Sequence, residues 1–124
     1  MLPFADFLVT VLPDSEHTRN VIDKEVFKQM NPQSMLINVG RGSAVNEQDL
    51  AEALNAGEIA AAALDTTKKE PLEKDSPLWE AKNCYITPHD SAHSLMSLPR
   101  SFNLFLENVA NLKDGKPVKN LFEL

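Results

Sequence analysis

Three side chains that could perform acid–base chemistry or bind an anion lie just beyond the ends of short apolar segments: Arg41, Glu70 and His89. A guanidinium pairs with a carboxylate through two parallel hydrogen bonds, and an imidazole exchanges protons near neutral pH. A nearby carboxylate can orient such an imidazole. Considered singly, each has a plain alternative, namely a solvated arginine in a turn, a solvated carboxylate and an exposed loop histidine.

The elements that would position these side chains are four apolar segments, residues 6–12, 34–39, 59–64 and 84–87. Each is followed directly by Pro, Gly or Asp, which are typical of turns. Near-continuous apolar character is typical of parallel strands buried on both faces. The segments are therefore predicted to be strands of one sheet, although the alanine-rich third one is a weaker signal.

Helical patterns alternate with these strands. Asp23 is the expected N-cap of a short helix to Met30, and Asn46 is the expected N-cap of a helix that Gly57 ends. A third helix is predicted over residues 94–112. Strands that alternate with helices predict an α/β fold with a parallel sheet. The carboxyl ends of its strands share one edge, where such folds bind ligands, so we expect the three side chains to lie there together.

The motifs at these strand ends resemble those of a known family. In order, they are Leu12-Pro13, Asn38-Val-Gly-Arg-Gly42, Leu64-Asp65, Glu70-Pro-Leu72, Ser76-Pro-Leu-Trp79 and Thr87-Pro-His89. This set is similar to the signature of the D-isomer-specific 2-hydroxyacid dehydrogenases, which include glyoxylate/hydroxypyruvate reductases and phosphoglycerate dehydrogenase. The resemblance covers essentially the whole chain, including the closing residues 115–120.

The resemblance implies a catalytic role for three residues. Arg41 would bind the carboxylate of a 2-keto or 2-hydroxy acid and polarise the reacting carbonyl. His89 would be the general acid/base, and Glu70 would orient its ring and favour its protonated form. The implied reaction is hydride transfer between NAD(P)H and the 2-keto acid.

The resemblance also implies contacts with NAD or NADP. Asp65 would hold the nicotinamide carboxamide, and Val39 and Gly40 would offer backbone groups near the nicotinamide. Leu12 and Pro13 would line the adenosine side, and Thr18 would contribute a hydroxyl. Plain turn geometry is an equally good account of these softer positions. The residue that usually selects NAD or NADP follows the second strand of the complete nucleotide fold, so the choice stays open.

The chain departs from the family pattern at two points. Asp90 places a charge next to His89, where an apolar residue is usual, and such a charge can perturb the histidine. In addition, the 124 residues contain no Gly-x-Gly-x-x-Gly. We therefore expect one truncated NAD(P)-binding domain over residues 1–124, a partial Rossmann-like sheet without the phosphate loop or the substrate domain. Such a chain is expected to bind cofactor weakly and to be inactive alone.

Truncation also predicts self-association. In a sheet of order 3-2-1-4-5-6 the chain would supply strand 4 onward, so its first strand would form an unpaired edge. The last helix would expose an apolar stripe that includes Phe102, Phe105, Leu106 and Val109. We expect a homo-oligomer formed through the sheet edge or the C-terminal helix. The competing hypothesis for function is a non-catalytic module that binds a partner through these surfaces.

Composition excludes several other classes. The net charge is −6 and the basic residues form no cluster, so nucleic acid is not an expected partner. No apolar run approaches the roughly 20 residues that span a bilayer. One cysteine and no signal-peptide pattern predict a cytoplasmic protein. A metal site at His89 and His93, four residues apart, has no clear third ligand, so no metal is expected.

Overall fold

The computed structural model describes residues 1–121 and divides the chain into two compact units. The first covers residues 1–91 and the second begins at Ala92. Each unit is described by itself.

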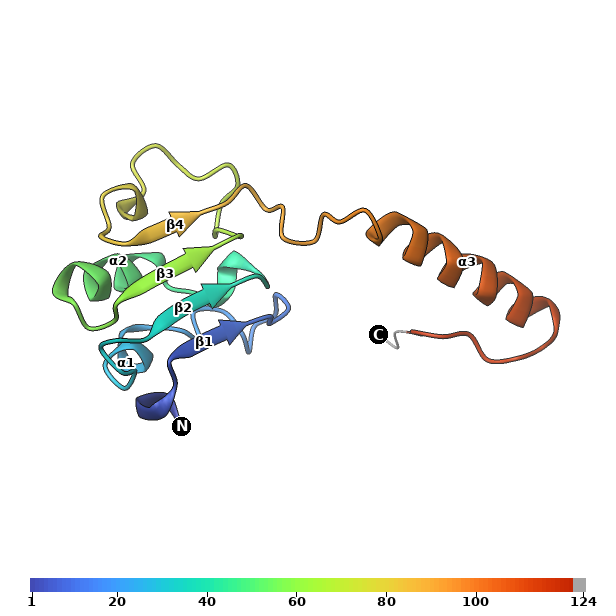
Figure 1. The fold of residues 1–124 in the computed structure, drawn as a ribbon, viewed down its shortest axis with the longest axis horizontal. Coiled ribbons are helices and arrows are strands. Elements are labelled where there is room, and N and C mark those ends of the chain that lie inside the picture. Colours follow the sequence, from blue (N-terminus) through green and yellow to red (C-terminus); the bar gives the residue numbers. More distant parts are fainter. Residues whose placement is uncertain (122–124) are drawn as a thin grey trace. The chain divides into compact units, whose positions relative to one another are not determined.

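The first unit contains a sheet of four parallel strands in the order β1-β2-β3-β4 (Figure 1). The strands are β1 (Phe7–Thr10), β2 (Met35–Asn38), β3 (Ala61–Leu64) and β4 (Cys84–Ile86). The predicted parallel α/β fold is confirmed, and β1 lies at an edge of the sheet as expected. The strands pair so that their last residues form one row, namely Thr10, Asn38, Leu64 and Ile86.

Two helices, α1 (Lys24–Phe27) and α2 (Glu47–Ala56), lie on the same face of the sheet (Figure 1). Both predicted caps are confirmed: Asp23 Oδ1 accepts the amide protons of Glu25 and Val26, and Asn46 Oδ1 accepts that of Asp49. Gly57 ends α2 in the left-handed region, with φ 74°. Three 3-10 turns complete the elements of this unit: η1 (Leu2–Phe4), η2 (Gly42–Ala44) and η3 (Pro77–Trp79).

The first helix is shorter than predicted. It ends at Phe27 rather than Met30, because the amides of Gln29 and Met30 bond three residues back instead of four. Such tightening is common where a helix meets a turn, and Pro32 follows closely. Met30 is still buried, so the apolar pattern marked the right residues for the core.

The two faces of the sheet differ in burial. Side chains on one face pack against the helices in a core that includes Phe27, Leu36, Leu50 and Leu64. On the other face, Phe7, Val9 and Tyr85 are 63%, 54% and 61% exposed. Burial on both faces, which the apolar pattern predicted, therefore holds for one face only.

The second unit is built on helix α3 (Ser97–Lys113). Pro99 lies in its first turn, where the missing amide proton does no harm, and Gly115 follows its end at φ 67°. Phe102 and Phe105 stack at 6.5 Å between ring centroids and are both exposed. No helix within residues 1–121 is both long enough and apolar enough to span a membrane.

Candidate active site

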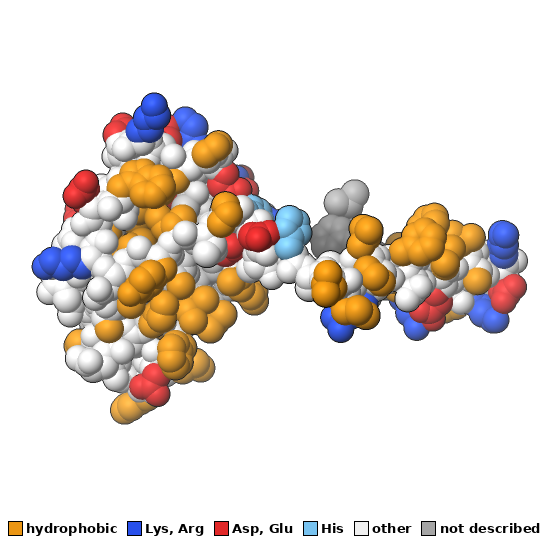
Figure 2. Space-filling model, turned by 45° about the horizontal axis from the view of Figure 1, so that its top comes forward, with side chains coloured by type: hydrophobic (Ala, Val, Ile, Leu, Met, Phe, Trp, Pro, Cys, Tyr) orange, Lys and Arg blue, Asp and Glu red, His pale blue; other side chains and the backbone are white. Residues whose placement is uncertain are grey.

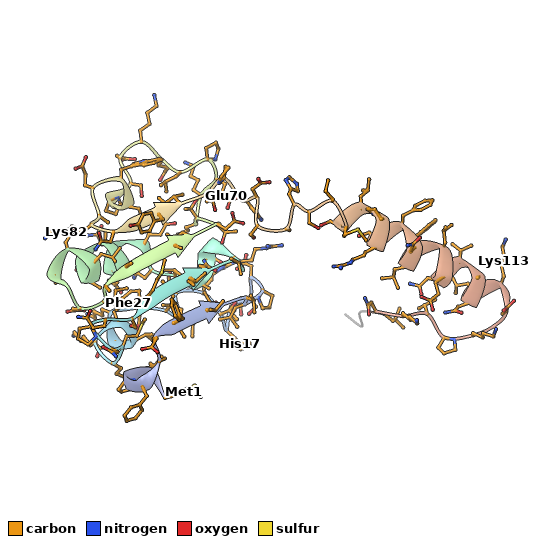
Figure 3. The ribbon with its side chains drawn as sticks, in the orientation of Figure 1. Met1, His17, Phe27, Glu70, Lys82 and Lys113 are labelled. Atoms are coloured by element: carbon orange, nitrogen blue, oxygen red, sulfur yellow. The ribbon has the colours of Figure 1, made fainter. Side chains whose placement is uncertain are left out.

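The three predicted catalytic residues follow strands whose ends lie in one row. Figure 3 shows Glu70 at the carboxyl edge of the sheet and Lys82 at the opposite edge. Arg41 follows β2, Glu70 follows β3, and His89 follows β4. The aligned strand ends therefore bring the loops of Arg41, Glu70 and His89 to one edge, as the alternating pattern predicted.

The structure brings Glu70 and His89 into direct contact. His89 Nδ1 lies 2.8 Å from Glu70 Oε2, and the two side chains are 44% and 40% exposed. The other carboxylate oxygen, Glu70 Oε1, accepts the amide proton of Thr67 at 3.1 Å. Glu70 is thus fixed by its own loop while it holds one ring nitrogen of His89. The second ring nitrogen, Nε2, takes no part in this contact.

The environment of Glu70 favours the ionised carboxylate. The hydrogen bond with His89 is the largest influence that lowers the pKa of Glu70, and the amide of Thr67 adds to it. The positive charge of Arg41 lowers the same pKa by a smaller contribution, while partial burial acts in the opposite direction. A carboxylate that stays ionised suits a residue whose role is to hold an imidazole.

Arg41 is exposed, and Asn38 shapes the turn that carries it. Asn38 is fully buried at the end of β2; its Oδ1 accepts the Gly40 amide proton at 3.0 Å and its Nδ2 donates to the Arg41 carbonyl at 3.2 Å. The Arg41 guanidinium donates to the Gly40 carbonyl at 3.1 Å. The turn that carries Arg41 is therefore stabilised by the buried Asn38 side chain, and the guanidinium stays accessible.

The glycines beside Arg41 are required by close backbone packing. A Cβ on Gly40 would lie 2.7 Å from the Leu12 nitrogen, and a Cβ on Gly42 would lie 2.0 Å from the Thr67 carbonyl carbon. Neither distance is possible for a real side chain. The loop after β2 is thus pressed against the loops after β1 and β3, which fixes Arg41 relative to Glu70.

Asp65 is buried at the end of β3 and accepts several hydrogen bonds from the loop after β4. Its Oδ1 accepts from the Thr87 hydroxyl at 2.6 Å and the Asp90 amide at 2.9 Å, and its Oδ2 accepts from the Ser91 amide at 2.9 Å. Hydrogen bonds from Ser91 and Thr87 hold the pKa of Asp65 far below its usual range. Asp65 is therefore an ionised acceptor at neutral pH.

The other predicted cofactor contacts lie at the same edge, but several of their polar groups already have partners. The Thr18 hydroxyl donates to the Pro13 carbonyl at 2.6 Å and so closes its own loop. The Val39 amide donates to the Thr10 carbonyl, and the Gly40 amide is taken by Asn38. These bonds account for the local structure of the loops, and a role of these residues in cofactor binding stays a prediction.

Two cavities flank the strand ends. One of about 370 Å³ has an apolar floor of Ile37, Ala63 and Tyr85, with Val39 and Asp65 also in its lining. The other, of about 570 Å³, contains Glu70, His89, Leu72 and Trp79. Both volumes fall in the range of small-molecule sites. The Trp79 indole nitrogen donates to the Glu73 carbonyl at 2.8 Å, which holds the loop around the second cavity.

Sequence reasoning assigned no role to Asn38 or Thr87, although both hold the loops of the site. Asn38 could have been noticed as a polar residue at the end of an otherwise apolar strand. Thr87 gave no such signal, because its partner Asp65 is distant in sequence. Within residues 1–121, no group of three or more His, Cys, Asp or Glu side chains is arranged to hold a metal ion.

Comparison with known proteins identifies the family of this chain. Residues 1–91 match the family described as D-isomer specific 2-hydroxyacid dehydrogenase, NAD binding domain. The chain belongs to this family. The hydroxypyruvate reductase of Blautia hydrogenotrophica is 36% identical over 118 residues, covering 95% of this chain and 37% of that protein. The D-3-phosphoglycerate dehydrogenase of Archaeoglobus fulgidus is 34% identical over 124 residues, covering all of this chain and 24% of that protein.

The fold is shared with solved structures of the family. An NADPH-dependent glyoxylate/hydroxypyruvate reductase from Sinorhizobium meliloti, in complex with NADP and sulfate, matches with a TM-score of 0.87 and 31% identity. The match covers 98% of this chain and 40% of that structure. The chain therefore spans well under half the length of these 2-hydroxyacid dehydrogenases, and it has the fold of their NAD-binding domain.

Gly42→Ala tests the close packing of the loops. We expect the free energy of unfolding to fall by about 3 kcal/mol, the upper range for overpacking, because the new methyl meets the backbone of Thr67. The control is Gly57→Ala, where a Cβ meets open space and only the left-handed backbone costs about 1 kcal/mol. Chemical denaturation measures both. Equal losses in the two variants would contradict the packing described for Gly42.

Glu70→Gln tests the ionised state of Glu70. The folded-state pKa of Glu70 is lowered from 4.5, so its carboxylate stabilises the fold fully above that value and loses this effect as the pH falls through the lowered pKa. We expect the wild-type chain to be more stable than the variant at pH 6 by about 0.5 kcal/mol, the scale of a half-exposed pair. The difference should shrink toward pH 3. Denaturation across this range measures it, and a difference that does not change with pH would contradict the assignment.

Proposed function

We propose that this chain carries the acid–base machinery of an NAD(P)-dependent 2-hydroxyacid dehydrogenase, which reduces a 2-keto acid or oxidises the corresponding D-2-hydroxy acid. The observation that carries the proposal is the 2.8 Å contact between His89 Nδ1 and Glu70 Oε2 at the edge that also bears Arg41. Members of the family with known names act on different substrates, so the particular 2-hydroxy acid is not part of the proposal.

The proposed chemistry follows from the geometry of the pair. With Nδ1 hydrogen-bonded to Glu70, Nε2 of His89 gives a proton to the carbonyl oxygen of the 2-keto acid during reduction. It takes a proton from the hydroxyl of the 2-hydroxy acid during oxidation. Glu70 fixes the ring and stabilises the charge that the ring carries. The guanidinium of Arg41 binds the carboxylate of the acid and polarises the neighbouring carbonyl. When bound, the nicotinamide cofactor supplies or accepts the hydride.

The residues present fit a nicotinamide group. The 370 Å³ cavity offers apolar side chains for the ring to pack against, and the ionised Asp65 in its lining suits a carboxamide N–H. Val39 and Gly40 would lie beside the ring, and Leu12, Pro13 and Thr18 would line the adenosine side. We also propose that the protein acts in the cytoplasm, which is supported by its single cysteine.

A second candidate function, a self-associating or partner-binding module, is favoured by the exposed apolar surfaces. Figure 2 shows hydrophobic side chains along α3, where Leu98, Phe102, Phe105, Val109 and Leu112 alternate at spacings of four and three. That spacing is typical of a helix that pairs with another helix. β1 is an edge strand with exposed Val9, and exposed Val11 follows it, so this edge is the other surface that could join two copies.

Titration of the chain with NADH and NADPH, followed by calorimetry up to millimolar concentration, tests the cofactor site. We expect saturable but weak binding, with a Kd of about 1 mM. The backbone amides of a glycine-rich loop normally hold the pyrophosphate, and these 124 residues contain no such loop. Val39→Glu should abolish binding by placing a charge in the cavity. Val21→Glu makes the same change before α1 and should leave binding unaltered. Absence of saturation, or equal binding by Val39→Glu, would contradict the proposed site.

Light scattering at micromolar concentration tests self-association. We expect a mass above that of one chain, and a return to the monomer in the double variant Phe102→Glu and Phe105→Glu, which charges the apolar stripe of α3. Asn103→Glu, on the same helix between those two residues, is the control and should stay associated. If the double variant stays associated while Val9→Lys becomes monomeric, the β1 edge is the interface. A wild-type monomer would contradict self-association altogether.

A further inference from the structure

His89 adopts a backbone conformation that its surroundings must maintain. Its φ is 58°, in the left-handed region that non-glycine residues rarely occupy. Such a conformation is kept only where neighbouring interactions hold it in place. The ring contact with Glu70 fixes the side chain, but the backbone also needs anchors on both sides of His89.

Both anchors lead to Asp65. Before His89, the Thr87 hydroxyl donates to Asp65 Oδ1 at 2.6 Å, and after it the amides of Asp90 and Ser91 donate to Oδ1 and Oδ2 at 2.9 Å each. A carboxylate has about four lone-pair sites, so most of the acceptor capacity of Asp65 is used by the loop of His89. Asp65 is only 5% exposed, and its own backbone is fixed because its amide bonds the carbonyl of Asn38.

We propose that Asp65 is a positioning residue: its carboxylate binds the loop on both sides of His89 and so holds the imidazole at the angle that meets Glu70. Two oxygen acceptors are needed, because two consecutive amides approach separate oxygens. An asparagine at this position has one oxygen and one NH₂ group, so at least one amide would face a donor. This role goes beyond a contact with the nicotinamide carboxamide, and it concerns the chain even when no cofactor is bound.

The inference rests on the proposed acid–base role of His89, but its test measures the geometry of His89 and not turnover. The chain has three histidines, so the ¹⁵N signals of the His89 ring can be assigned with His89→Asn. In Asp65→Asn, we expect these ring signals to move toward those of Glu70→Gln, in which the ring has lost its carboxylate partner. We also expect the Ser91 amide to exchange with solvent at least about tenfold faster.

Asp14→Asn is the matched control. Asp14 is another aspartate at this edge whose pKa is lowered, by the hydroxyl of Ser43 and by Arg19, and both of these partners lie outside the loop of His89. It should leave the His89 ring signals and Ser91 exchange as in the wild type. A folded Asp65→Asn chain with wild-type His89 ring signals and wild-type Ser91 amide exchange would overturn the proposal. That outcome does not depend on whether the chain is active as a dehydrogenase.

Thr87→Val keeps the proposal testable if Asp65→Asn does not fold. It removes one of the three hydrogen bonds and leaves the carboxylate with both amides. We expect a smaller displacement of the His89 ring signals in the same direction as in Glu70→Gln. His89 signals at their wild-type position in Thr87→Val would then overturn the proposal, and a displacement would support it.

Discussion

The site depends on how tightly the loops after the four strands pack against one another. The strands end in register, so their loops start side by side, and no side chain fits between the backbones at Gly40 and Gly42. The loops after β3 and β4 are joined differently, by hydrogen bonds from the amides of Asp90 and Ser91 to the Asp65 carboxylate. Arg41, Glu70 and His89 therefore lie on loops that contact one another in sequence, so the position of each loop depends on its neighbour.

This arrangement explains why chemistry can lie on loops that have little regular structure. Loops are usually more variable than the elements they connect. Here the loop residues are fixed by buried polar groups, Asn38 under the Arg41 turn and Asp65 under the His89 loop. Buried polar groups that are fully bonded specify a geometry more sharply than apolar packing does. The half-exposed side chains of Glu70 and His89 can thus face solvent and still keep a defined contact.

Much of this could be predicted from the sequence. The apolar segments bounded by turn residues located all four strands. Asp23 and Asn46 begin their helices and Gly57 ends one, as capping preferences predict. The order of the motifs identified the family, which the match of residues 1–91 bears out. Parallel strands also required Arg41, Glu70 and His89 to share an edge, because their loops leave the sheet at the same side.

Other features could not be predicted, for physical reasons. An apolar run in the sequence does not tell whether one face of the strand or both faces are covered. The exposure of Phe7 and Tyr85 could therefore not be predicted. The shortened end of α1 depends on a choice between bonds of nearly equal energy. The bonds of Asp65 join residues 22 to 26 positions apart, and no local pattern encodes them. Gly40 and Gly42 stand out in the sequence only as parts of a motif, because the loops that pack against them come from distant parts of the chain.

The loop of Glu70 has one more property. It contains Trp79, the only tryptophan of the chain, which is 56% exposed and lines the cavity of Glu70 and His89. The indole nitrogen of Trp79 donates to the Glu73 carbonyl. Indole emission changes with the polarity around the ring. The tryptophan fluorescence of this chain therefore comes from one position, in the lining of the cavity that contains Glu70 and His89, and it can report on what enters that cavity.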